Sequence, residues 1–201
     1  MPRVKEKASA PPRERILQAA RELFYRDGIN AVSVDAVAAA AGTNKMTLYR
    51  QFTSKDALVA EYLSELAARA DEVWETARAG HPGDAQAQLR AVLKRVSQFA
   101  DECTGRGCAL ANVAVELGER NHPARRIIEA HKRKSRERLV KLCREAGYVQ
   151  PERLADELFL LVEGARVSLQ SAGKQGPGSR LFAVAEQLLR STPRRRQRTL
   201  L

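Results

Sequence analysis

The chain has few of the residues that build disulfide frameworks or membrane spans. It contains three cysteines, and aromatic residues make up 5% of its 201 residues. A small, odd number of cysteines argues against a disulfide framework and favours a reducing compartment. No uncharged apolar run approaches the ~20 residues that a membrane span needs, and residues 1–15 lack the apolar segment of a secretory signal. We therefore expect a cytoplasmic protein with no membrane partner.

Proline and glycine are scarce inside the long segments of the chain. None of the eight prolines needs to lie within a helix, and of the twelve glycines only Gly164 lies deep within an apolar periodic segment. Because both residues are costly in helix interiors, the segments between them are free to be helical. No alternating segment rich in Val, Ile and Thr is bounded by hairpin turns. The expected fold is all-α, with about nine helices at 12–27, 34–41, 45–51, 54–78, 83–102, 107–117, 122–146, 151–173 and 179–191.

Capping residues mark several of these boundaries. Ser33 and Ser54 are suited to cap the helices that follow them, and Gly28 and Gly42 are suited to end the helices that precede them. The glycine-rich segment 173–178 is expected to be a flexible connection.

The first three helices have the arrangement of a helix-turn-helix, because the last two are short and joined by a glycine-centred turn. In that motif the second helix of the pair enters the DNA major groove while the first crosses the backbone. Leu48 and Phe52, four residues apart, would pack this recognition helix onto 12–27. A plain three-helix bundle has the same spacing, so spacing alone leaves both interpretations open. The polar side chains left facing outward, which can meet phosphates and base edges, are Thr43, Asn44, Lys45, Thr47, Tyr49 and Arg50.

A more specific pattern runs through the N-terminal part of the chain, across about 12–60. It consists of Arg15-Ile-Leu-Gln-Ala-Ala-Arg-Glu-Leu-Phe24, Gly28, Ser33-Val-Asp-Ala-Val-Ala38 to Ala41-Gly42, Met46-Thr-Leu-Tyr-Arg-Gln-Phe52 and Ser54-Lys-Asp-Ala-Leu58. This pattern resembles the N-terminal domain of the TetR (tetracycline-repressor-like) transcription regulators, and the resemblance fades beyond residue 80. It implies a homodimer with a DNA-binding helix-turn-helix domain over residues 12–58 and a helical ligand-binding and dimerisation domain over residues 59–192.

The resemblance also implies roles for single residues. Thr47 and Tyr49 would contact phosphates or base edges from the recognition helix, and Ser33 and Lys55 would contact phosphates at the starts of their helices. The positions at which the family varies its sequence readout are Thr43, Asn44, Lys45 and Arg50. This chain has Thr-Asn-Lys-Met at 43–46, where family members often carry smaller residues. The operator sequence of another family member therefore cannot be assigned to this chain, because Lys45 and Met46 could change it.

A sensor in the second half of the chain should have a mostly apolar pocket with a few fixed polar groups. The candidate ligand-binding residues are Trp74, Phe99, Cys108, Asn112, Glu116, Phe159, Glu163 and Arg166. A buried, unpaired carboxylate costs several kcal/mol, so Glu116 and Glu163 must be paired, exposed or in contact with a ligand. The alternative for Glu163 is a pair with Arg166 across one helical turn, or a pair across a dimer interface. Trp74 and Phe99 could equally be ordinary core residues.

The last two predicted helices have apolar faces suited to a dimer. The candidate interface residues are Leu158, Leu161, Ala165, Leu169, Leu181, Phe182, Ala185, Leu188 and Leu189, and Gly164 would permit close backbone approach. The resemblance implies that these helices build a four-helix interface. A two-fold dimer would also space two recognition helices about one DNA turn apart. The alternative is that both faces complete the core of one protomer.

Motifs of catalysis, phosphate-loop binding and metal hydrolysis are absent from the sequence. No catalytic, cofactor-binding or metal-binding residue is assigned, because the three histidines are scattered and no ligand set completes Cys103 and Cys108. A thiol-oxidation sensor made of these two cysteines is an alternative to their being small core residues.

The function that these patterns favour is a sequence-specific transcription regulator, a dimeric repressor that a small molecule releases from DNA. The expected partners are a pseudo-palindromic double-stranded DNA operator, a second copy of the chain and an unidentified small molecule. Activation is an alternative within this class, and a nonspecific, architectural nucleic-acid-binding protein is the alternative from another class. A peripheral membrane protein is disfavoured because no helix combines a basic face with a bulky apolar one.

The net charge of +11 is unevenly distributed. Residues 1–56 contribute +4, residues 125–144 contribute +7, residues 190–201 contribute +5, and the remainder contributes −5. Most of the excess positive charge therefore lies outside the presumed DNA-binding domain. Two interpretations of this charge remain, a solvated face and a loose contact with a polyanion. The segments 1–11 and 193–201 are expected to be disordered basic tails, and the arginines of the second tail could add nonspecific DNA affinity.

Overall fold

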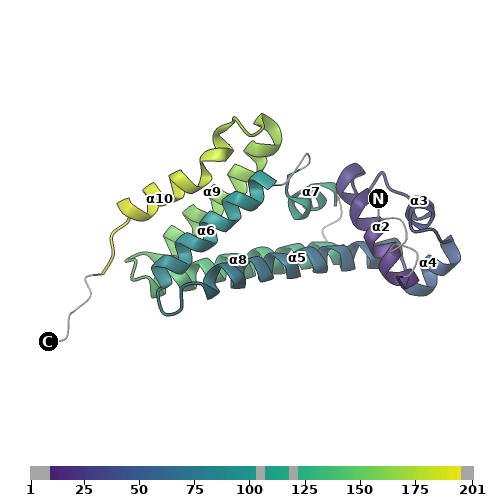
Figure 1. Ribbon diagram of the computed structural model, residues 1–201, viewed down its shortest axis with the longest axis horizontal. Helices are drawn as coiled ribbons and strands as arrows, with labels where there is room; N and C mark the ends of the chain where they lie inside the picture. Colours follow the sequence, from purple (N-terminus) through teal and green to yellow (C-terminus); the bar gives the residue numbers. More distant parts are fainter. Residues whose placement is uncertain (1–9, 103–106, 118–121, 196–201) are drawn as a thin grey trace. The chain divides into compact units, whose positions relative to one another are not determined.

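The computed structural model describes residues 10–102, 107–117 and 122–195, and it confirms the all-α expectation for them (Figure 1). The only β pairing in these ranges is an isolated bridge. The elements in chain order are α2 (Pro12–Asp27), α3 (Val34–Ala40), α4 (Lys45–Gln51), α5 (Lys55–Ala79), α6 (Ala85–Glu102), α7 (Ala109–Glu116), α8 (Pro123–Glu145), α9 (Pro151–Ala172), the 3₁₀ helix η1 (Pro177–Arg180) and α10 (Leu181–Ser191). In the described ranges no helix is both long and apolar enough to cross a bilayer.

The chain divides into two compact units. The first, which we call the head, comprises the residues up to Ala68 together with Ala109–Glu129, and the second, the body, comprises Arg69–Cys108 and the residues from Ala130 onward. The head therefore contains more chain than the 12–58 segment of the sequence, since α7 and the first turns of α8 belong to it. Both α5 and α8 contribute residues to the two units.

The head is built around the apolar face of α2. Ile16, Ala20 and Phe24 are buried there, and α2 packs against both α3 and α4. Leu48 of α4 is fully buried in this core, which is the packing that its four-residue spacing from Phe52 predicts. Burying such aliphatic side chains stabilises the head by roughly 1.5–3 kcal/mol each.

The body has its own core between α6, α8, α9 and α10. Its centre contains Leu89, Leu142, Leu154 and Leu158, all of which are 0–2% exposed. Figure 1 shows α6, α9 and α10 running alongside one another, and each of these three helices contacts the other two. Tyr148, in the α8–α9 turn, is buried against this core and donates its hydroxyl hydrogen to the carbonyl of Leu189.

Several residues predicted for the dimer interface lie inside this single-chain core. The buried ones are Leu158, Ala165, Leu181, Ala185 and Leu189, and the half-buried ones are Leu161, Leu169, Phe182 and Leu188. For the five buried residues, coverage within one protomer favours the alternative that these faces complete the protomer core. Their place in a dimer interface stays a prediction.

The glycine-rich connection before α10 is more ordered than predicted. Residues 177–180 form η1, and Gly178 is buried against α9. A Cβ on Gly178 would lie 2.6 Å from the carbonyl oxygen of Ala165, so only glycine permits this close approach. By contrast, a Cβ on Gly164 would meet nothing within 4 Å, so Gly164 is not needed for packing inside the protomer.

The beginning of the predicted C-terminal tail is also structured. The amide of Val149 donates to the carbonyl of Pro193, and the amide of Arg195 donates to the carbonyl of Gly147. Arg194 additionally donates to the side chain of Gln86 on α6. The expectation of disorder is therefore wrong for 193–195, and residues 196–201 lie outside the described part of the chain.

The positive charge of α8 is largely neutralised within the body. Lys132 pairs with Glu163, Arg136 with Asp156 and Arg144 with Glu152, all on α9. Lys134 and Arg138 both pair with Asp71 of α5. The sequence left two interpretations for this basic segment, a solvated face and a loose polyanion contact. The ion pairs disfavour the polyanion contact, because they already balance much of the charge.

Candidate nucleic-acid interface

The short helices α3 and α4 are joined by a tight turn. Ala41 is the C-cap residue that follows α3, Gly42 adopts φ +61° in the left-handed region, and the amide of Thr43 donates to the carbonyl of Ala38. Glycine is favoured at such a position because side chains with a Cβ are strained there. The turn therefore fixes the angle at which α4 follows α3, as the glycine-centred pattern predicts.

Side-chain caps define where both helices begin. The Oγ atom of Ser33 accepts a hydrogen bond from the amide of Ala36 at 3.1 Å, and the Oδ1 atom of Asn44 accepts one from the amide of Thr47 at 2.8 Å. The cap at Ser33 was predicted, whereas the cap at Asn44 was not. Each capping side chain keeps polar hydrogens, on Oγ and on Nδ2, that can be donated to a phosphate or a base.

The side chains predicted to meet DNA lie on the outer surface of the head. Ser33, Asn44, Lys45, Tyr49 and Arg50 are exposed, and Thr43, Thr47 and Lys55 are half-exposed. None of these eight side chains is part of the head core, so all of them are free to contact DNA. Their roles in DNA contact stay predictions.

One residue near them has an unexpected exposure. Methionine is usually buried, but the Met46 side chain on α4 is 68% exposed. An apolar side chain on a recognition helix can contact the C5-methyl group of thymine.

Lys45 is paired within the head. Its Nζ atom lies 3.2 Å from Oδ2 of Asp35 on α3, and both side chains are more than half exposed. An exposed pair of this kind contributes at most about 1 kcal/mol, so Lys45 can exchange Asp35 for a phosphate at little cost.

The start of α5 is fixed by contacts inside the head. Ser54 caps the helix by accepting from the amide of Ala57 at 3.0 Å, as predicted. Asp56 in its first turn lies 3.4 Å from Nε2 of His122, which immediately precedes α8. These contacts hold Lys55 at the beginning of the helix.

Glu116 at the end of α7 contacts the loop after α2, a role that the ligand-binding prediction did not anticipate. Its carboxylate accepts from the amide of Asn30 at 3.2 Å, and the Asn30 side chain donates to the carbonyl of Glu116 at 2.9 Å. A Cβ on Gly28 would lie 2.7 Å from that carboxylate. The partner of Glu116 is thus Asn30, which lies 86 residues earlier in the chain. No spacing rule connects the two.

Glu163 in the body lies between two cations. It pairs with Lys132 of α8 and, at 3.1 Å, with Nη1 of Arg166 one helical turn later. The Nζ atom of Lys132 also lies 5.9 Å from the ring centre of Phe159. The pair of Glu163 with Arg166 across one helical turn is the alternative to ligand binding that the sequence analysis gave. Lys132 is a second partner, which sequence spacing could not identify.

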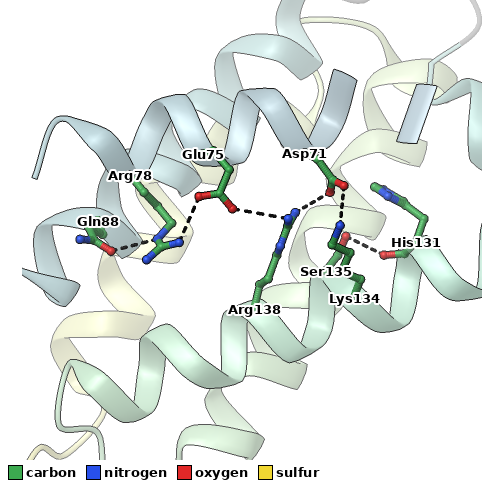
Figure 2. A network of polar contacts seen from close by, with 8 residues as sticks. All are labelled: Asp71, Glu75, Arg78, Gln88, His131, Lys134, Ser135 and Arg138. Atoms are coloured by element: carbon green, nitrogen blue, oxygen red, sulfur yellow. Dashed lines mark hydrogen bonds and ion pairs between the residues drawn. The ribbon is translucent and has the colours of Figure 1, made fainter. Parts of the chain in front are cut away.

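A second polar network joins α5 to α8 and α6 (Figure 2). Asp71 accepts from Lys134 at 2.6 Å and from Arg138 at 2.5 Å. Arg138 reaches on to Glu75, and its guanidinium lies 5.6 Å above the ring of Trp74. Burial acts to raise the pKa of Asp71, but the hydrogen bonds and charges of Lys134 and Arg138 outweigh it and place this pKa below its ordinary value. Trp74 therefore lies beside a permanently charged cluster.

His131 is near this network on α8. Burial is the main cause that lowers its pKa, and the neighbouring charge of Lys132 acts in the same direction, so the imidazole is neutral at pH 7.

The remaining residues predicted to bind a ligand do not belong to one unit. Asn112 belongs to the head and Cys108 to the body, both half-buried. The side chains of Phe99 and Cys103 lie outside the described residues.

Comparisons with known proteins agree with this arrangement. Residues 16–62 match the model of the bacterial regulatory proteins of the tetR family, and residues 85–185 match the model of the tetracyclin repressor-like C-terminal domain. The HTH-type transcriptional regulator UidR of Escherichia coli is 43% identical over 49 residues, which are 24% of this chain and 25% of UidR. The chain thus matches about a quarter of the length of this curated relative.

Solved structures extend the similarity to nearly the whole chain. A TetR-family transcriptional regulator from Streptomyces coelicolor has a TM-score of 0.80 and 28% identity, covering 89% of this chain and 94% of that protein. A complex of SmeT with triclosan has a TM-score of 0.73 and 18% identity, covering 90% of this chain and 91% of SmeT. At 18% identity the second likeness concerns the fold alone.

Proposed function

The chain belongs to the TetR family of DNA-binding transcriptional regulators, and on this premise we propose that it is a dimeric repressor that a small molecule releases from its operator. The observation that carries the proposal is the outer surface of α4. The side chain of Asn44 caps this helix, and its outward polar side chains do not take part in the head core. Two such helices, related by a two-fold axis, would read the half-sites of a pseudo-palindromic operator.

The proposed dimer surface is an exposed apolar patch on α9 and α10. It consists of Leu160, Gly164, Val167 and Val184, of which the three larger side chains are 69%, 59% and 44% exposed. The first three recur at helical spacing along one side of α9. Exposed apolar residues at such spacing are typical of an interaction surface, and a second copy of the same patch would cover it with Gly164 at the crossing point, where the lack of a side chain lets two helices approach.

A charge in the middle of this patch should separate the protomers. In Leu160→Glu two carboxylates would face each other near the two-fold axis without a cation, so we expect the dissociation constant of the dimer to rise by about 100-fold or more. Sedimentation velocity at micromolar protein measures the change. The matched control is Val149→Glu, which places the same charge on an apolar side chain that is 47% exposed but lies outside the patch. A Leu160→Glu variant that remains as dimeric as Val149→Glu contradicts this interface.

The ligand would bind in the body and act on the head through shared helices. Both α5 and α8 contribute residues to the two units, and Glu116 holds the end of α7 against the loop at Asn30. A ligand that prefers a body conformation in which the paired heads are wrongly spaced shifts the population away from DNA binding. SmeT, which shares the fold, has been solved with triclosan, and this supports a small-molecule partner without identifying it.

The proposal is tested with DNA chosen by the protein itself. A duplex enriched from a random library by repeated binding, which we call the selected duplex, is labelled with a fluorophore and used to screen small molecules for release. Because coupling is reciprocal, a releasing compound must bind the free protein more tightly than the DNA complex by the same factor. A compound that binds the body with equal affinity in the two states is not the effector.

The alternative, a nonspecific architectural protein, makes a different prediction. Binding would then be driven by phosphate contacts alone, with similar affinity for the selected duplex and for a random one. The neutralisation of α8 by Asp71 and the acidic residues of α9 removes one of the charged surfaces that this alternative requires.

A further inference from the structure

The arginines of α2 differ in their partners. Arg13 pairs with Glu61, and its guanidinium lies 5.0 Å from the ring centre of Phe52. Arg21 donates from Nε to Glu65 at 2.6 Å, and Arg26 donates to the adjacent Asp27. Each of these three charges is thus balanced by a carboxylate within the head.

Among the described residues, Arg15 has no such partner. Its Nε atom is buried, and no residue in the described part of the chain accepts a hydrogen bond from it. No described carboxylate lies within ion-pair distance of its guanidinium either. A buried donor of a charged group is costly when it is unpaired. Since the other arginines of α2 have acidic partners, Arg15 is the arginine of this helix most suited to bind an anion from outside the head.

The guanidinium of Arg15 lies at the turn of the helix-turn-helix. A Cβ on Gly42 would be 3.6 Å from its Nη1 atom, which is ordinary van der Waals contact, and Gly42 itself is exposed. Arg15 therefore extends from α2 to the turn between α3 and α4, two residues before Asn44, whose side chain caps α4.

From this geometry we infer that Arg15 is a DNA-backbone contact, in which its guanidinium binds a phosphate beside the half-site that α4 reads. Arginine has five N–H donors in a planar fork that matches the oxygens of a phosphate. Such a contact fixes the register of the helix-turn-helix on the duplex without reading its sequence. The inference rests on the proposed function, because it assumes that α4 enters the major groove.

The test replaces Arg15 with methionine, which keeps an unbranched apolar stem against the turn and removes the charge. We expect affinity for the selected duplex and for a random duplex to fall by the same factor, roughly 10-fold or more, since a dimer loses two charge-assisted contacts. The slope of log affinity against log salt should become shallower by about 1.8, the value for two phosphates. Thermal unfolding should show a midpoint equal to or above that of the unmodified protein, because a buried unpaired donor has been removed.

The matched control is Arg26→Met, which removes the same charge from the same helix at a residue that Asp27 already neutralises. It should leave both affinity and salt slope close to those of the unmodified protein. Arg15→Lys keeps a cation at the site and should keep the salt slope even if some affinity is lost, and it also serves if the methionine variant fails to fold.

The possible results distinguish a failure of the Arg15–phosphate contact from a failure of the proposed repressor function. If the unmodified protein prefers the selected duplex while Arg15→Met matches Arg26→Met in affinity and slope, Arg15 is not a phosphate contact. If Arg15→Lys loses the slope as fully as Arg15→Met, the charge is not what binds and the inference is again overturned. If the unmodified protein itself prefers no duplex, the proposed function fails first.

Discussion

Replacing Gly28 with alanine is expected to destabilise the head by roughly 2–4 kcal/mol. Gly28 follows α2 with φ +89° and ψ 159°, and it is buried. This backbone conformation is essentially restricted to glycine. The added Cβ would also lie 2.7 Å from one carboxylate oxygen of Glu116 and 2.8 Å from the other. The Glu116 side chain would have to move and give up its hydrogen bond to Asn30. Urea unfolding followed by circular dichroism measures the loss.

Two control variants divide this loss into its causes. Gly147 has a similar φ of +81°, but a Cβ there would meet nothing within 4 Å, so Gly147→Ala reports backbone strain without a clash. Adding Glu116→Ala to Gly28→Ala removes the clash and should leave only the strain, so the two substitutions should be less than additive. If Gly28→Ala costs as much in the Glu116→Ala background as in the unmodified protein, Glu116 does not pack on Gly28.

The double substitution Thr47→Ala with Tyr49→Ala is expected to weaken binding to the selected duplex by about 100-fold or more. The two side chains face outward from α4, and each direct contact to DNA is worth roughly 1–3 kcal/mol, lost once in each protomer. Fluorescence anisotropy of the labelled duplex measures the affinity. Neither side chain belongs to the head core. The free energy of unfolding should therefore change by no more than about 0.5 kcal/mol, as is usual for surface substitutions.

The control for this prediction lies on the same helix. Gln51→Ala alters an exposed residue of α4 that is not among the predicted DNA contacts. It should leave the affinity for the selected duplex within about twofold of the unmodified protein. If the double variant binds as tightly as Gln51→Ala, α4 does not face the DNA through Thr47 and Tyr49.

Local features of the head could be predicted from the sequence because short-range chemistry determines them. A serine before a helix and a glycine after one act within a few residues, and the caps at Ser33 and Ser54 and the positive φ at Gly42 are found where they were expected. The burial of Leu48 follows from its spacing on an amphipathic helix.

Contacts between residues far apart in the chain could not be predicted in this way. Asn30 and Glu116 meet across 86 residues, and nothing in either local pattern indicates the other. On α9 every position from 158 to 162 is apolar, so periodicity gives no basis for separating buried from exposed positions. Yet Leu158 is fully buried, whereas Leu160 is 69% exposed. Only packing against α6 and α10 distinguishes the face of α9 that the protomer covers from the face that it leaves exposed.

Sequence-specific binding by the head can be measured directly by competition between two DNA duplexes. The affinity of the unmodified protein is determined for the selected duplex and for a random duplex of equal length at 150 mM salt. We predict a pseudo-palindromic selected sequence that is bound about a thousandfold or more tightly than the random duplex, which is the lower range for specific binding proteins. Equal affinity for the two duplexes, with steep salt dependence for both, would show that the head does not read a DNA sequence.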